Sequence, residues 1–214
     1  MNPTEEGGII VLGAGGHGKS VVSVLLVSGL PVTGVLDDTP EKWGRDVQGV
    51  PILGPIAELG HYPNCSAVIA LGDNADRQTI AERFPDARWA TVLYPHAFIN
   101  PTARIGLGTI VFPGAVIGPG VIIGEHVIVS ANTTVGHETI LEDYVHVAPG
   151  VQIAGRTHVG QGAMLGIGSI VCPKVNIGEE AVLAAGAVAV TDIPARSRAL
   201  GVPAKVAQAK QHVA

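Results

Sequence analysis

The sequence is poor in aromatic residues, in charged residues and in cysteine. Its 214 residues include only two Trp, three Tyr and three Phe, and charged residues make up 14%. Large aromatic side chains normally supply much of a buried core, so this chain must build its core from smaller aliphatic residues. Hydrophobic residues still account for 47% of the sequence, which is enough for a globular protein.

Several classes of protein are disfavoured by what is missing. The net charge is −5 and the 13 Lys and Arg are scattered, so we expect no nucleic-acid partner. No apolar run reaches the roughly 20 residues of a membrane span. The acidic start "MNPTEEGG" is unlike a signal peptide. We therefore expect no membrane partner. Cys65 and Cys172 form no C-x-x-C pair and imply no disulfide framework, so we expect a cytoplasmic protein.

Glycine and proline are abundant instead, with 29 and 15 residues. The second half of the chain is strictly periodic, with an aliphatic residue at every sixth position from 99 to 183. A small or β-branched residue follows each aliphatic residue of this period by four positions. Six residues are too few for a helix pair, so the hexad predicts a short strand plus a tight turn, with three hexads closing a triangular coil of 18 residues. Stacked aliphatic side chains would then form the core. The aliphatic positions are Ile99, Ile105, Val111, Ile117, Ile123, Val129, Val135, Leu141, Val147, Ile153, Val159, Leu165, Val171, Ile177 and Leu183.

The first half, residues 8–93, alternates strand and helix patterns and predicts a parallel sheet in a small Rossmann-like domain. Strands are expected at "GIIVLG", "VTGVLDD", 50–53, "SAVIALGD" and "RWATVL", and helices at "HGKSVVSVLLVSG", 55–60 and 75–84.

The stretch "GAGGHGKS", residues 13–20, fits two phosphate-binding patterns. Read as G-x-x-x-x-G-K-S it is a P-loop, and read as G-x-G-x-x-G it is a dinucleotide-type fingerprint. The second interpretation is favoured because Asp37 lies 24 residues after Gly13, at the end of the next strand. Lys19 could neutralise a phosphate or simply face solvent. His17 could reach a sugar or could be an ordinary polar residue of the first helical turn.

The hexad repeat resembles that of the left-handed parallel β-helix of the hexapeptide acyltransferases. With "GAGGHGK", "LDD" and "LGDN" ahead of the repeat and "GVPAK" after it, the chain looks like the sugar O- and N-acetyltransferases of that family, which act on sialic acids or on nucleotide-linked amino sugars such as bacillosamine and perosamine. The resemblance implies a nucleotide-sugar-binding domain over 1–94 and a β-helical acetyltransferase domain with a C-terminal tail over 95–214. It also implies a homotrimer.

The sequence "VGHET" holds the candidate catalytic pair. The residues one coil away from His137 are Pro119 and Gly155, which leaves room at its side chain. A carboxylate on one ring nitrogen frees the other to accept a proton, although adjacent strand residues point to opposite faces and converge only at a turn. The resemblance places the general base at His137 and the acid that tunes it at Glu138.

The remaining site residues follow from the resemblance. The nucleotide-sugar would be held by Gly13, Ala14, Gly15, His17, Asp37, Asp38, Gly72, Asn74 and Ser130. Acetyl-CoA, the cosubstrate, would be held by His146, Gly155, Ile167, Ala185 and Lys205.

The predicted activity is transfer of acetyl from acetyl-CoA to the 4-amino group of a UDP- or GDP-linked amino-deoxysugar. An O-acetyltransferase of the sialic acid type is the alternative, and a non-catalytic scaffold is a third. A β-helical carbonic anhydrase would need two coil histidines five residues apart, and the intervals between His126, His137, His146 and His158 do not supply them, so we expect no metal.

Overall fold

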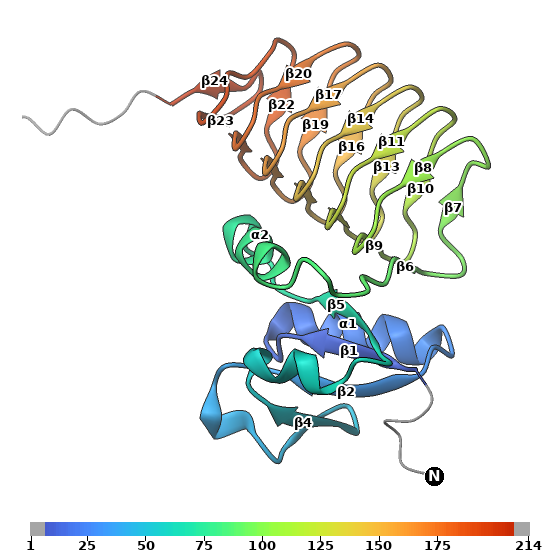
Figure 1. Ribbon diagram of the computed structural model, residues 1–214. Helices are drawn as coiled ribbons and strands as arrows, with labels where there is room; N and C mark the ends of the chain where they lie inside the picture. The colour runs from blue at the N-terminus through green and yellow to red at the C-terminus, as the bar shows by residue number, and fades with distance from the viewer. Residues whose placement is uncertain (1–6, 208–214) are drawn as a thin grey trace, which may run out of the picture.

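The computed structural model describes residues 7–207; the start of the chain at 1–6 and its last residues, 208–214, lie outside this part. An α/β domain lies against one side of a long parallel β-helix (Figure 1). The predicted fold class, a small Rossmann-like domain followed by a left-handed parallel β-helix, is confirmed. No helix within 7–207 is long and apolar enough to cross a membrane.

The α/β domain is built on a sheet of order β3-β4-β2-β1-β5. Strand β1 pairs in parallel with both β2 and β5, and only β3 and β4 are antiparallel. The chain therefore crosses from one side of β1 to the other, and crevices at such switch points are where α/β sheets bind ligands. The elements are β1 (Ile9–Leu12), α1 (Gly16–Val27), β2 (Val32–Leu36), β3 (Asp46–Val47), β4 (Val50–Gly54), β5 (Ser66–Ile69) and α2 (Asn74–Arg83), with 3-10 helices at Pro40–Lys42 and Ile56–His61.

One predicted strand belongs elsewhere. The pattern at 88–93 suggested a last strand of the first half, but regular pairing is limited to β6 (Val92–Leu93), which pairs with β9 of the β-helix. Only an isolated bridge between Ala67 and Trp89 links this stretch to the first sheet. Because "RWATVL" alternates like any half-buried strand, its residues do not reveal which sheet it joins.

The β-helix has three flat faces. Each strand except β23 has two residues, and from β6 to β22 the pairing joins positions 18 apart, such as Ile128 with His146. Face 1 comprises β6, β9 (Ile110–Val111), β12 (Ile128–Val129), β15 (His146–Val147), β18 (Met164–Leu165), β21 (Val182–Leu183), β23 (Arg198–Leu200) and β24 (Lys205–Val206). Face 2 comprises β7 (Phe98–Ile99), β10 (Val116–Ile117), β13 (Thr134–Val135), β16 (Gln152–Ile153), β19 (Ile170–Val171) and β22 (Val188–Ala189). Face 3 comprises β8 (Arg104–Ile105), β11 (Ile122–Ile123), β14 (Ile140–Leu141), β17 (His158–Val159) and β20 (Asn176–Ile177).

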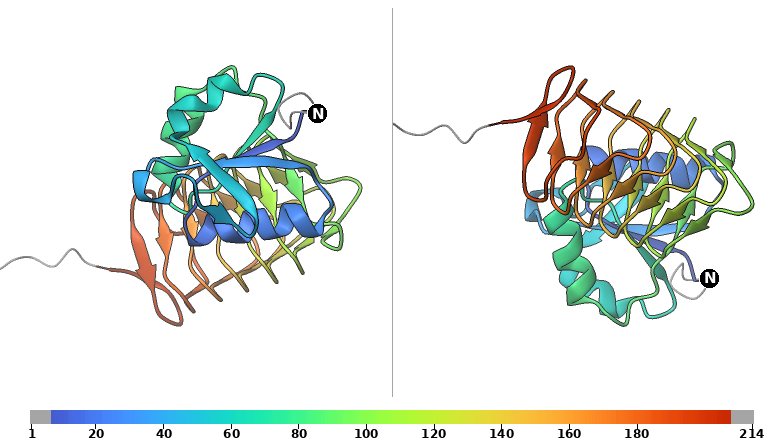
Figure 2. Two further views of the ribbon diagram at one scale, coloured as in Figure 1. Left: turned by 90° about the horizontal axis from the view of Figure 1, so that it is seen from below. Right: turned by 90° about the horizontal axis from the view of Figure 1, so that it is seen from above.

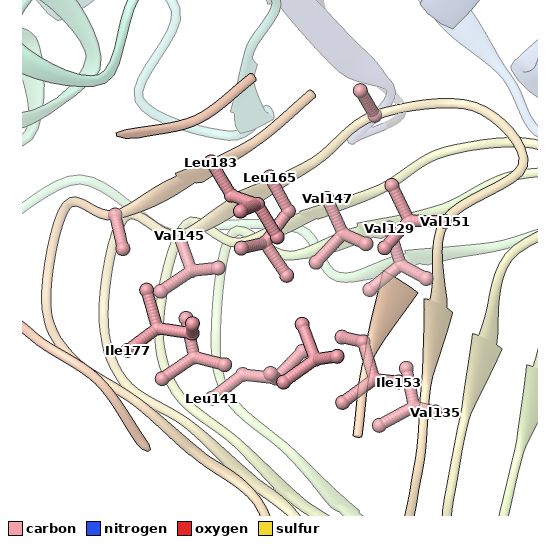
Figure 3. Close-up of a cluster of buried hydrophobic side chains, with 14 of the residues drawn as sticks. Val129, Val135, Leu141, Val145, Val147, Val151, Ile153, Leu165, Ile177 and Leu183 are labelled. Carbon is pink, nitrogen blue, oxygen red and sulfur yellow. The ribbon is translucent and has the colours of Figure 1, made fainter. Parts of the chain in front are cut away.

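The predicted inward positions fill the interior. From Val111 to Leu183, every sixth residue is at most 2% exposed, and the aliphatic side chains gather inside the coils (Figure 3). In the same strand as Leu141, the outward Ile140 is 39% exposed. Since successive strand residues point to opposite sides, a six-residue rhythm keeps one of each pair inside.

The corners of the coil are made by left-handed backbone. Every sixth residue from 108 to 186 has a positive φ, and only half of these residues are glycine. Left-handed conformation costs about 1 kcal/mol or more for other residues, so packing of the coils must hold it in place. It also ends the alternation of side chains at the corner. The non-glycine members are His126, Asn132, Glu138, Tyr144, Arg156, Lys174 and Glu180.

The α/β domain packs on face 1, where Ile110 and Ile128 share a buried cluster with Val21 of α1, and Figure 2 shows the two domains against each other from below and above. Arg77 of α2, only 1% exposed, joins the two domains: its Nε donates to the His126 carbonyl at 3.1 Å and its Nη2 to the Tyr144 carbonyl at 2.6 Å. Burial lowers the pKa of this guanidinium to about 10. Its remaining acceptors are the carbonyls of Leu71, Gly72 and Asp73 and the side chain of Asn74.

His126 is buried beside Arg77. Its ring stacks on Tyr144, with centroids 5.5 Å apart, and meets the edge of Trp89 at 4.9 Å. The residue is 2% exposed, and its Nδ1 has no hydrogen-bond partner within residues 7–207. Burial, and secondly the charge of Arg77, lower the pKa of His126 to about 4.

This burial predicts a dependence of stability on pH. An unfolded histidine takes up a proton near pH 6.5, whereas folded His126 stays neutral down to about pH 4. The unfolded chain binds more protons between these values, so the free energy of unfolding falls as the pH is lowered from about 6.5 to 4. His17, whose pKa is also lowered to about 4, contributes in the same window.

The His126→Asn variant tests this, because Asn tolerates the positive φ at this position. Urea unfolding at pH 7 and pH 5 should show a smaller loss of unfolding free energy for the variant than for the wild type. The exposed His96→Asn serves as control and should match the wild type. An equal loss in wild type and His126→Asn would contradict the assignment.

Candidate functional site

The glycine-rich turn lies between β1 and α1 at the switch point. Gly13 has a φ of 115°, and α1 already begins at Gly16. A Cβ at Gly18, inside the helix, would overlap the carbonyl of Gly13, so only glycine allows this close contact. This is the geometry of the dinucleotide-type fingerprint, because a P-loop would place these glycines in a longer loop before the helix. Lys19 is exposed on α1.

Asp37, at the end of β2, holds the turn in place. Its carboxylate accepts the N–H of Ala14 at 2.7 Å and that of Thr39 at 2.9 Å, and pairs with Lys42 at 3.0 Å. Burial would raise the pKa of Asp37, but these hydrogen bonds outweigh it and hold the pKa below its usual value. The side chain is thus occupied within the protein. The adjacent Asp38 is exposed, and one of its oxygens accepts the N–H of Ile56 at 2.8 Å.

A cavity of about 300 Å³ opens at the carboxyl ends of β1, β2 and β5. Its lining residues are Gly13, Asp37, Asp38, Thr39, Ile56, Leu71, Asp76, Thr79 and Ile80. The cavity therefore combines apolar walls with carboxylates, and none of its lining side chains is cationic.

Two residues predicted to bind the nucleotide-sugar, Gly72 and Asn74, do not line this cavity. They line a separate cavity of about 490 Å³ between α2 and face 1. The Asn74 amide donates to the Gly162 carbonyl at 2.7 Å, so it binds the β-helix. The sequence "LGDN" gives no sign of this, because the β-helix residue involved is 88 positions away.

His17 and His146 meet where the glycine-rich turn faces the β-helix. Their ring centroids are 6.3 Å apart, and His17 also packs on Phe112 at 5.6 Å. His146 Nδ1 lies 3.0 Å from the Gly72 carbonyl, an oxygen that can only accept, so Nδ1 carries the proton. Burial lowers the pKa of both histidines. His17 Nε2 has no partner within residues 7–207.

His137 and Glu138 do converge, at the corner between faces 2 and 3. His137 Nδ1 lies 3.1 Å from Glu138 Oε2, and the positive φ of Glu138 is what turns its side chain toward its neighbour. Arg156, one coil further, donates from Nε to the same oxygen at 2.9 Å. The hydrogen bond from Arg156 and then that from His137 lower the pKa of Glu138.

The predicted room beside His137 is provided by Gly155. A Cβ at Gly155 would overlap Nε2 of the His137 ring, so the ring occupies the space of the missing side chain. The same corner position is Pro119 one coil before His137 and Pro173 one coil after Gly155.

The other predicted residues are spread over the β-helix. Ile167 and Ala185 are stacked at the corner between faces 1 and 2, where the Gly186 N–H donates to the Ile167 carbonyl. Ile167 is 63% exposed, whereas Ser130 is buried. Lys205 lies in β24 at the end of the β-helix. Gly155 lies at a different corner of the chain, the one between faces 2 and 3.

Sequence reasoning missed two arginines at these sites. Arg77 gives no signal, because a buried arginine in α2 looks like any exposed helix residue. Arg156 could have been found, because it lies 18 residues after Glu138 and so falls on the same corner one coil later. Within residues 7–207, no group of three His, Cys, Asp or Glu could hold a metal ion.

Comparison with known proteins gives a family match for the first domain. Residues 8–84 match the family model of the PglD N-terminal domain. An uncharacterised protein, L142 of Acanthamoeba polyphaga mimivirus, is 30% identical over 100 residues; that match covers 47% of this chain and 20% of L142.

Solved structures match over nearly the whole chain. A perosamine N-acetyltransferase mutant from Caulobacter crescentus, in complex with CoA and GDP-perosamine, is 32% identical with a TM-score of 0.89, covering 95% of this chain and 98% of that one. The acetyltransferase domain of PglB from Neisseria gonorrhoeae, in complex with acetyl coenzyme A, is 31% identical with a TM-score of 0.87, covering 93% and 98%. The chain therefore belongs to the hexapeptide-repeat sugar acetyltransferase family.

Proposed function

We propose that this protein transfers the acetyl group of acetyl-CoA to the 4-amino group of an amino-deoxysugar linked to a nucleoside diphosphate, with His137 as general base. The observation that carries the proposal is the His137 ring, backed by the Glu138 carboxylate and packed over Gly155 on a rigid corner. The complexes of the perosamine enzyme with CoA and GDP-perosamine, and of PglB with acetyl coenzyme A, support the two substrates.

The contacts of His137 and Glu138 support a direct mechanism with one proton relay. Glu138 accepts from Nδ1, so Nε2 keeps its lone pair and can take a proton. The sugar nitrogen attacks the thioester carbonyl while Nε2 of His137 removes its proton. The C–N bond forms, the C–S bond breaks, and the proton returns from Nε2 to the departing CoA sulfur. No covalent enzyme intermediate is required.

We infer that the N–H of Gly155 binds the oxygen that becomes negative during the attack. The coil does not use the N–H at this corner position, since Pro119 and Pro173 occupy it one coil before His137 and one coil after Gly155. The Gly155 N–H is therefore free for a ligand next to Nε2 of His137. A backbone donor of this kind typically contributes a rate factor of about 10² to 10³.

The acceptor pocket and the base lie on opposite sides of the β-helix. The cavity beside Gly13 is lined only by residues of the α/β domain, which lies against face 1, whereas His137 lies at the corner between faces 2 and 3. A second chain that brings its corner to this cavity would complete the site. Gly155 and the pair Ile167 and Ala185 lie at different corners of one chain, so a groove between two chains would let one acetyl-CoA contact all three. We therefore propose a homotrimer with active sites between chains.

Replacing the base is the first test. In a CoA-thiol release assay with nucleotide-linked 4-amino sugars, His137→Asn should lose at least about 100-fold in kcat, the lower end for loss of a general base. His158→Asn is the matched control, because His158 also pairs with a β-helix carboxylate, Glu142, at 2.8 Å. Activity should be unchanged in that control.

Two results would contradict the proposal in different ways. Full activity of His137→Asn would remove the histidine from its role. Turnover of free sialic acid alone, with no nucleotide-linked amino sugar accepted, would instead favour the O-acetyltransferase.

The cavity beside Gly13 favours guanine as the nucleobase. Ile56, Leu71 and Ile80 offer apolar walls for a flat ring, and the carboxylates of Asp38 and Asp76 offer only acceptors. Guanine presents two adjacent N–H donors to a carboxylate, whereas uracil presents one donor between two carbonyl oxygens that the carboxylates repel. Mismatched polar groups of this kind are strongly disfavoured.

We expect GDP to bind at least about tenfold more tightly than UDP in calorimetry. Asp76→Asn should reduce this ratio, while Asp86→Asn, which removes an acid lining a different cavity, should not. Equal affinity for GDP and UDP in the wild type would contradict the guanine assignment.

A complementation experiment tests the shared site. Gly15→Asp should block phosphate binding at the start of α1 without harm to the fold, because Asp is a favourable N-cap and a Cβ at Gly15 meets no atom within 4 Å. Co-expression of Gly15→Asp chains with His137→Asn chains should restore about a quarter of wild-type activity in a trimer that mixes at random. No restored activity would place each site within one chain.

A further inference from the structure

The corner that carries His137 also carries a column of charged residues spaced one coil apart. Glu138, Arg156, Lys174 and Asp192 follow one another at intervals of 18 residues. Glu138, Arg156 and Lys174 all have the left-handed backbone of the corner. Side chains from successive coils thereby lie side by side, so Arg156, one coil after Glu138, can bind the carboxylate that also binds His137.

One carboxylate oxygen serves two donors. Glu138 Oε2 lies 3.1 Å from Nδ1 of His137 and 2.9 Å from Nε of Arg156. Arg156 therefore restricts the rotation of the Glu138 side chain and withdraws charge from the oxygen that faces the imidazole. The groups that face His137 at this corner are Glu138 and Arg156, with Lys174 one coil further.

The pair has little to do with stability. The side chains of Arg156 and Glu138 are 59% and 57% exposed, and exposed ion pairs contribute little to the free energy of folding. The consequence of the contact lies in the orientation and charge of Glu138.

We propose that Arg156 is a positioning residue, which holds Glu138 against Nδ1 of His137 and limits how strongly the carboxylate stabilises the protonated ring. The proposal rests on the proposed function, in which His137 must be neutral to act as a base. Without Arg156, the full negative charge of Glu138 would act on the ring, so the carboxylate would stabilise the protonated form of His137 more strongly. The freed Glu138 would also orient the ring less well.

The test compares Arg156→Gln and Arg156→Lys with the wild type. The titration of the His137 ring is followed by NMR, with the signal assigned through His137→Asn, and kcat and KM are measured across pH. In Arg156→Gln the midpoint of the ring titration should rise by about half a pH unit, as expected for an exposed charge at this distance. The acidic limb of the kcat/KM profile should move with it, and kcat should fall several-fold. Arg156→Lys keeps the charge and should return the midpoint toward the wild-type value.

Two controls separate positioning from general effects. Arg196→Gln removes a similar ion pair at another corner, where Arg196 binds Glu179 at 2.7 Å and Glu180 at 3.1 Å, and should leave the profile unchanged. In a Glu138→Gln background, Arg156→Gln should cause a clearly smaller shift, because its effect passes through the carboxylate.

The possible failures are distinguishable. An unchanged midpoint in Arg156→Gln, or a shift of the same size in the Glu138→Gln background, would overturn the proposal. An increase only in the KM for acetyl-CoA would also overturn it, by making Arg156 a ligand of the cosubstrate. If the wild type transfers no acetyl group but the ring titration shifts as expected, the proposed function fails and the positioning effect of Arg156 stands.

Discussion

The structure depends on a left-handed turn placed every sixth residue. From 108 to 186 this backbone conformation recurs without a gap, and each turn redirects a two-residue strand so that three of them close one coil. Nothing in the coil needs a large side chain, because aliphatic residues such as Leu141 and Val147 fill its interior. The scarcity of aromatic residues is thus a consequence of the turn spacing. The same turns set the chemistry, since they stack every corner residue above one that lies 18 positions away.

The sequence revealed the β-helix because its period is local and strict. Core positions such as Leu141 and Val147 could be identified individually, since each depends only on the six-residue rhythm. The convergence of His137 and Glu138 could be proposed but not decided from the sequence, because it depends on the φ of one residue. The catalytic roles of His137 and Glu138, and the contacts of the CoA-binding residues with the cosubstrate, remain predictions.

Contacts between the halves lay beyond the reach of sequence patterns. Arg77 and Asn74 donate hydrogen bonds to backbone carbonyls, and because every residue has a carbonyl, the sequence does not indicate which residues accept them. Nor could the pattern "RWATVL" show that β6 joins the β-helix instead of the first sheet. The loop after β5 contributes to both cavities, because Leu71 lines the cavity beside Gly13 and Gly72 lines the cavity between α2 and face 1. The relation of the two domains is therefore fixed by side chains that read as ordinary surface residues.

The exposure of the proposed base points to the role of assembly. The side chain of His137 is 55% exposed in a single chain, and there its hydrogen bonds compete with water. Preorganised donors and bases are most effective where water is excluded and the effective dielectric constant is low. A β-helix corner cannot enclose its own side chain, because every corner is convex. In the proposed homotrimer, the substrates and a neighbouring chain would exclude water from His137, which is the physical reason for proposing an intersubunit site.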